Sequence, residues 1–157
     1  MFETGTEQYK LSRQLAHFRK SKPMSESTTE FENLGHEKQR RLSNLIAVQP
    51  GEKLLIASLY QDNWLLLSSR RIFYGTGNEC IFALRYSEIL ECGWFVGDEE
   101  FSDQDIDGIP LKACPKLKIL TRTGDKYTML LEPGAAHNLV WNNIRFRVRL
   151  EVIHEQR

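Results

Sequence analysis

The sequence lacks the features that identify general nucleic-acid binders, membrane-spanning proteins and the common enzyme classes. Its 21 basic residues are balanced by 21 acidic ones, whereas nucleic-acid binders usually carry a basic excess. No apolar run approaches the roughly 20 residues that cross a bilayer. A Gly-x-Ser-x-Gly elbow, a phosphate-binding glycine loop and a His-Glu-x-x-His helix are all missing. We therefore expect a non-catalytic protein that binds no nucleic acid and needs no metal and no cofactor.

Cysteine is scarce and forms no motif. The three cysteines, Cys80, Cys92 and Cys114, lie far apart and include no Cys-x-x-Cys pair, which is typical of reduced thiols in a cytoplasmic protein. The first residues lack the pattern of a signal peptide, so the expected location is the cytoplasm. Cys80 and Cys92 lie within apolar runs and are expected to be buried, whereas Cys114 precedes a proline and is expected to be the most exposed. The four histidines have no metal-ligand spacing and are expected at the surface.

Residues 1–28 form a basic extension that is either helical or disordered. Leu11, Leu15 and Phe18 recur at helical spacing, which is typical of an amphipathic helix. The cations of this segment are Lys10, Arg13, Arg19, Lys20 and Lys22. Such a helix would bind an anionic membrane surface weakly and in a salt-sensitive way. The competing interpretations are packing on the body of the protein and disorder.

Residues 29–49 carry the pattern of a second helix. Thr29 and Glu32 have the spacing of a capping box, in which two side chains satisfy free backbone N–H groups. Several apolar residues follow at helical spacing. Gly35 weakens this pattern, so the alternative is a helix that begins near His36.

Beyond residue 50 the pattern changes to short apolar runs separated by turn residues, which is typical of an antiparallel sandwich or barrel. Strands are expected at 53–60, 63–69, 71–75, 80–86, 88–96, 116–122 and 126–132. In the last of these, Tyr127, Met129 and Leu131 alternate with polar residues. Residues 135–157 predict a C-terminal helix, although the alternation over 145–150 leaves a strand as the alternative for its tail.

Two stretches resemble the bacterial PH-like and GRAM pattern. Residues 64–74, WLLLSSRRIFY, are similar to an aromatic-aliphatic strand that runs through a small polar pair and a basic residue into a second apolar strand. Residues 82–89, FALRYSEI, resemble the element that follows it. The resemblance implies a domain of the pleckstrin-homology superfold over residues 50–157. This fold is α+β and mostly β, a seven-stranded antiparallel barrel or roll with a C-terminal capping helix, here preceded by an N-terminal helical extension.

The resemblance also implies a binding module. Some members bind phosphoinositides, which requires several basic residues that converge on one loop. The loops at 61–63 and 75–79 carry no basic residue. We therefore do not expect this ligand.

A long loop after the fifth expected strand concentrates negative charge. Its acidic residues are Asp98, Glu99, Glu100, Asp103, Asp105 and Asp107. The stretch from Asp103 resembles the start of a calcium loop, but Cys114 stands where the bidentate glutamate belongs. No metal site is predicted, and a weak cation site of another kind is the open alternative. Such a loop attracts a basic protein surface. We predict a non-catalytic protein-interaction module, either an immunity-type inhibitor or an adaptor, with a basic protein partner; the alternative is a solvated acidic loop.

The expected C-terminal helix carries a tryptophan and several arginines. Trp141 lies beside the apolar stripe and either packs at the edge of the barrel or contacts the partner. Arg145 and Arg149 share one helical face, and Arg147 has the spacing to pair with Glu151. A second tryptophan, Trp94, alternates with Leu90, Cys92 and Val96, which favours burial of that whole set.

Overall fold

The computed structural model describes residues 6–21, 25–99, 105–106 and 108–155. Its helices are α1 (Glu7–Ser21), α2 (His36–Ser43) and α3 (Ala135–Glu155). Its strands are β1 (Thr28–Glu30), β2 (Leu54–Tyr60), β3 (Asn63–Ser68), β4 (Arg71–Thr76), β5 (Glu79–Arg85), β6 (Ile89–Gly93), β7 (Asp105–Ile106), β8 (Ile109–Pro110), β9 (Lys116–Thr121) and β10 (Lys126–Leu130). Short 3-10 turns occupy Phe31–Asn33, Tyr86–Glu88 and Leu111–Ala113.

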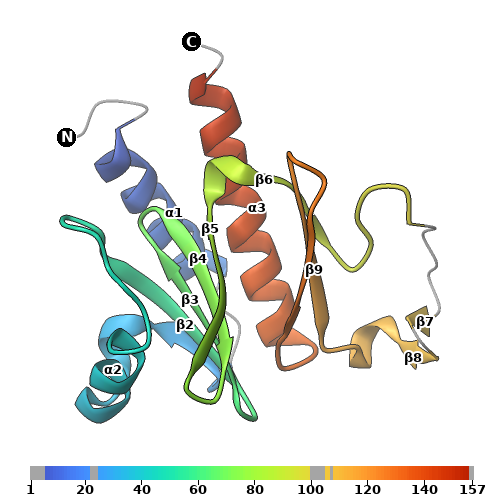
Figure 1. Ribbon diagram of the computed structural model, residues 1–157, viewed down its shortest axis with the longest axis horizontal. Helices are drawn as coiled ribbons and strands as arrows, with labels where there is room; N and C mark the ends of the chain where they lie inside the picture. The colour runs from blue at the N-terminus through green and yellow to red at the C-terminus, as the bar shows by residue number, and fades with distance from the viewer. Residues whose placement is uncertain (1–5, 22–24, 100–104, 107, 156–157) are drawn as a thin grey trace.

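The fold is α+β, with two main antiparallel sheets. The first has the order β1-β2-β3-β4-β5, the second has the order β10-β9-β6, and β7 and β8 form a small hairpin. In Figure 1, α3 runs diagonally, with the five-stranded sheet on one side and β9 on the other. Within the described residues the two sheets do not join into a closed barrel, so that form of the prediction is wrong. The predicted count of seven strands is not confirmed either, because β1, β7 and β8 are additional.

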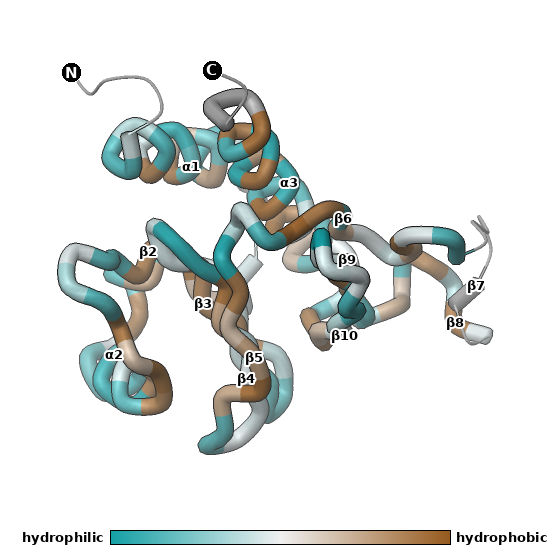
Figure 2. The backbone as a smooth tube through the Cα atoms, turned by 45° about the horizontal axis from the view of Figure 1, so that its top comes forward, coloured by the Kyte–Doolittle hydropathy of each residue, from teal (hydrophilic) through white to brown (hydrophobic). Residues whose placement is uncertain are grey.

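Strand β3 is buried on both faces. Leu65 and Leu67 belong to a core cluster shared with α1, α3 and the second sheet. Trp64 and Leu66 point the other way, into a second cluster with Leu42 of α2 and its neighbours. In Figure 2, strand β2 lies between α1 and α2, which cover opposite faces of the sheet. This two-sided burial explains the continuous apolar run at residues 64–67, because a strand with one wet face would alternate.

The helix predicted over residues 29–49 is wrong in its first part. Thr29 lies in β1 and pairs with Ala57 of β2, so its spacing to Glu32 is not a capping box. The helix begins at His36, directly after Gly35, as the alternative reading of the sequence proposed. It is eight residues long. The free edge of β2 offers residues 28–30 a full set of backbone partners, and this tertiary pairing outweighs the local helical pattern.

Helix α1 is formed and packs on α3, which confirms one of the three interpretations of the N-terminal segment. Its apolar residues Leu11, Leu15 and Phe18 pack against the main core. Beside them Gln14 is fully buried and donates hydrogen bonds to Tyr86 Oη (3.1 Å) and Asn143 Oδ1 (3.0 Å). These hydrogen bonds connect α1 to α3 and to Tyr86 within an otherwise apolar interface.

Helix α3 is continuous to Glu155, so the strand alternative for its tail is wrong. The predicted pair of Arg147 with Glu151 is present. Arg147 is nearly fully buried, donates to the Ser69 carbonyl (3.1 Å) and stacks over the Tyr86 ring at 4.6 Å. The pair therefore connects α3 to the turn between β3 and β4 instead of lying on a solvated face.

Several burial predictions are wrong, because the burial of a side chain depends on segments that lie far away in the sequence. Cys80 is exposed on the edge strand β5, Cys92 is half-buried, and Cys114 is buried. His137 was expected at the surface but is 1% exposed. Its Nε2 lies 2.9 Å from the Lys116 carbonyl, which can only accept, so this nitrogen carries the proton. Burial lowers the pKa of His137 below its usual value.

A buried carboxylate holds the turn between β3 and β4. The Glu52 side chain has no exposed surface and binds the Arg71 guanidinium through both oxygens, at 2.6 and 3.0 Å. Ser68 Oγ and the Gln49 backbone N–H donate to it as well, at 2.6 and 2.9 Å. Burial by itself would raise the pKa of Glu52, but these donors outweigh it and lower the pKa to about 2. Ser68 and Arg71, which lie in one of the stretches that carry the PH-like resemblance, therefore have a structural role.

Candidate functional site

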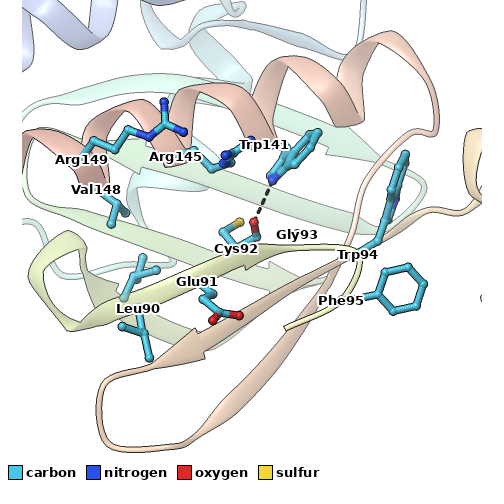
Figure 3. A pocket seen from close by; sticks show the side chains of 11 residues that line it. Leu90, Glu91, Cys92, Gly93, Trp94, Phe95, Trp141, Arg145, Val148 and Arg149 are labelled. Carbon is cyan, nitrogen blue, oxygen red and sulfur yellow. Dashed lines mark hydrogen bonds between the residues drawn. The ribbon is translucent and has the colours of Figure 1, made fainter. Parts of the chain in front are cut away.

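A groove of about 590 Å³ lies between β6 and the middle of α3 (Figure 3). Its lining is mainly apolar and aromatic. One wall consists of Ile89, Leu90, Glu91, Cys92, Gly93, Trp94 and Phe95, and the other consists of Trp141, Arg145, Val148 and Arg149. Concave apolar surfaces of this size with a few polar groups are typical of binding sites.

The groove runs along an edge strand. β6 pairs with β9 on one side, and no strand among the described residues pairs with its other side. At one point the edge is already capped, because the Trp141 indole N–H donates to the Cys92 carbonyl oxygen at 2.7 Å (Figure 3). Leu90 is 49% exposed. An edge strand with an exposed apolar side chain is a template for pairing with another chain.

An aromatic stack supports the α3 wall. The Trp141 and Trp94 rings are stacked at 6.0 Å, and Trp94 is stacked in turn on His137 at 5.1 Å. On the groove side the Arg145 guanidinium lies 4.9 Å from the centre of the Trp141 ring. Trp141, which the sequence left between packing and partner contact, does pack, and it also lines the groove.

The charges that line the groove favour an anionic partner. Arg145 and Arg149 form no ion pair within the described part of the chain. The carboxylate of Glu91 lies on the same lining but accepts the Gly97 backbone N–H at 2.7 Å. The groove therefore presents two free cations beside one carboxylate that already has a local donor.

The predicted acidic loop is described only at its start and at β7. Glu99 lies 3.1 Å from Lys118 Nζ, and Asp98 lies 3.6 Å from Lys126 Nζ. Burial by itself would raise the pKa of Glu99, but the hydrogen bond from Lys118 and the other donors and charges around it lower the pKa. Glu100, Asp103 and Asp107 lie outside the described residues, as does the side chain of Asp105. Part of the predicted negative charge is thus matched by lysines of this chain, and docking of a basic surface on the loop stays a prediction.

The predicted lipid-binding cations are only partly available on α1. Lys10 pairs with Glu151 at 3.0 Å, and Arg19 pairs with Glu30 at 2.6 Å. Arg13 and Lys20 are exposed, and Lys22 lies outside the described residues. Because the apolar face of α1 packs against the core, it is not available to a membrane in this arrangement.

The thiol on the lining of the groove is a poor nucleophile. Cys92 is the thiol on its lining, and burial raises the pKa of this thiol to about 12, so the nucleophilic thiolate is scarce at neutral pH. Across the described ranges no cluster of three His, Cys, Asp or Glu side chains is arranged to hold a metal ion. None of the helices in those ranges is long and apolar enough to cross a membrane.

Comparison with known proteins identifies no relative: no family model, no curated protein and no solved structure matches the chain. A functional argument therefore depends on the geometry of the groove.

Sequence reasoning identified Trp141 but missed the groove beside it. Leu90 was expected inside with Trp94, yet Ile89 is fully buried and Leu90 points out, because β6 carries an irregularity between Ile89 and Glu91 that changes the side-chain alternation. The two walls are also far apart in the sequence. Besides Trp141, the shared face of Arg145 and Arg149 was the signal visible in advance.

Proposed function

We propose that this protein is a non-catalytic protein-interaction module that binds an extended segment of a partner protein between β6 and α3. The observation that carries the proposal is an edge strand without a strand partner in the described chain, facing an apolar groove. An extended peptide can add to such an edge through backbone hydrogen bonds while its side chains enter the neighbouring pocket.

The dimensions of the groove support this mode of binding. β6 is five residues long, which is about the usual length of a paired strand. Because Trp141 already donates a hydrogen bond to the Cys92 carbonyl, the incoming segment pairs with the remaining backbone groups of this edge. Trp141 and Arg145 stand together on the α3 wall, and tryptophan and arginine are the residue types most often found at energetic hot spots of interfaces. The exposed Leu90 supplies apolar area on the opposite wall.

The finer description of the fold belongs to the same proposal. We infer that β2 to β5, then β6, β9 and β10, then α3 form an open roll of the pleckstrin-homology plan. Two consecutive antiparallel meanders followed by a helix support this reading. Three free cysteines suit a cytoplasmic location. An immunity-type inhibitor and an adaptor are both uses of such a module.

A charge placed in the groove tests the proposal. Decapeptides selected from a displayed random library against the wild-type protein are expected to shift the amide resonances of residues 89–93 and the indole N–H resonance of Trp141. The Leu90→Lys variant is expected to weaken their binding at least tenfold, because it places an ammonium group in the apolar wall. Ile81→Lys is the matched control, since Ile81 is 55% exposed on β5 and lies off the groove lining. Selected peptides that shift other residues, or that bind Leu90→Lys as well as wild type, would show the proposal to be wrong.

A further inference from the structure

We propose that the groove selects segments with two acidic side chains two residues apart, which bind Arg145 and Arg149. This inference rests on the proposed function, because it names the chemistry of the segment that adds to β6. The argument uses the spacing of the two arginines, their availability and the aromatic neighbour that orients one of them.

The spacing of the two arginines matches an extended chain. Arg145 and Arg149 are four residues apart on α3, and four residues rise about 6 Å along a helix. Alternate residues of a strand point to the same face and are about 6.6 to 6.8 Å apart. An extended segment that follows α3 can therefore place residues i and i+2 opposite the two guanidinium groups.

Both guanidinium groups are available for a carboxylate. Neither has an ion-pair partner in the part of the chain that the structure describes. Arg147, which lies between them in sequence, is buried and pairs with Glu151 on another side of the helix. An arginine can bind a carboxylate through two parallel hydrogen bonds, so an incoming acidic side chain finds a partner of matching shape.

Trp141 defines the position before the acidic pair. It precedes Arg145 by four residues, again about 6 Å along the helix. The centre of its ring lies 4.9 Å from the guanidinium carbon of Arg145. Because this contact already restricts the arginine side chain, the arginine loses less conformational entropy when it binds a carboxylate. An apolar side chain two residues from the first acidic one would contact this ring. The preferred segment is therefore apolar-x-acidic-x-acidic, in whichever chain direction pairs with β6.

Three short peptides distinguish this inference from the proposed function itself. The probe is an acetylated and amidated hexapeptide, leucine-threonine-aspartate-threonine-aspartate-threonine. One comparison peptide has asparagine in place of both aspartates, and the other has the two aspartates adjacent. Binding is measured by tryptophan fluorescence at low salt and located by the amide shifts of residues 89–93. We expect the probe to bind at least tenfold more tightly than either comparison peptide, and to lose this advantage in high salt because exposed charges are screened.

Variants of the two arginines complete the test. Arg145→Gln and Arg149→Gln are each expected to weaken the acidic probe about fivefold and to leave the asparagine peptide unchanged. Arg85→Gln is the control, because Arg85 is an exposed arginine off the groove lining. Equal binding of all three peptides at β6 would overturn the preference for acidic segments but would still agree with the proposed function. Failure of every peptide to shift β6 would overturn this inference, whereas the proposed function is decided separately by the peptides selected from the library.

Discussion

Replacing Gly75 with alanine is expected to lower the free energy of unfolding by about 3 kcal/mol, the upper end of the usual cost of overpacking a core. A Cβ atom at this position would lie 2.2 Å from Trp64 Cζ2 and 2.2 Å from the carbonyl oxygen of Glu79. Trp64 is 2% exposed and has no room to turn away. Its indole N–H also donates to the Gly77 carbonyl at 3.1 Å. Urea denaturation followed by circular dichroism measures the loss.

Gly35→Ala is the matched control for this substitution. A Cβ at Gly35 would meet no atom within 4 Å, and its φ of −58° is one that alanine adopts freely. We expect its stability to stay within about 0.5 kcal/mol of wild type, as for an ordinary surface substitution. Because Gly75 and Trp64 are in contact, adding Trp64→Leu to Gly75→Ala should cost less than the sum of the two single changes. A Gly75→Ala protein as stable as wild type would contradict the packing described here.

The second large effect is expected for Glu52→Gln, which should cost about 3 kcal/mol because it leaves a largely buried guanidinium without its counter-charge. The Glu52 side chain has no exposed surface, and Arg71 is 16% exposed. The glutamine side chain can replace only part of this contact. Its oxygen accepts hydrogen bonds as the carboxylate does, but its NH2 group is a donor and would face the donors of the site. Glu132→Gln, at an exposed position on the chain, is expected to leave the stability unchanged.

The Glu52 carboxylate also makes the free energy of unfolding depend on pH in the acidic range. The folded pKa of Glu52 is about 2, against a reference value of 4.5. A lowered carboxyl pKa means that the stabilisation is complete above pH 4.5 and is lost as the pH falls toward 2. Wild type should therefore lose stability over this range faster than Glu52→Gln, and the two denaturation midpoints should converge. Parallel curves from pH 7 to pH 2 would contradict the assigned role of Glu52.

The sequence was most informative where a local pattern and the tertiary environment agree. In β10, Met129 is buried as the alternation predicts, while Lys126 and Thr128 are exposed. The helical spacing over residues 135–157 gave α3 nearly to its end, and the Arg147–Glu151 pair follows from that helix. These features depend on neighbours within a few residues, which is why periodicity alone recovers them.

The wrong predictions concern features that depend on contacts between segments far apart in the sequence. Thr29 has the residue type and spacing of a helix cap but is a strand residue because β2 offers it an edge. His137 has the polarity of a surface residue but is buried against the Lys116 carbonyl. The groove joins β6 to α3 across a long separation in the chain, and no local pattern encodes it. Of its lining, Trp141 and the spacing of Arg145 and Arg149 on α3 were visible in the sequence.

The two-sided burial of β3 has a consequence for how the molecule opens. Trp64 and Leu66 serve one hydrophobic cluster, while Leu65 and Leu67 serve the other, on a single short strand. Loss of either cluster uncovers one face of this strand and weakens its packing in the sheet. The α2 layer and the α3 layer therefore belong to one cooperative unit, and the β3 amides should exchange with solvent only when the whole molecule unfolds.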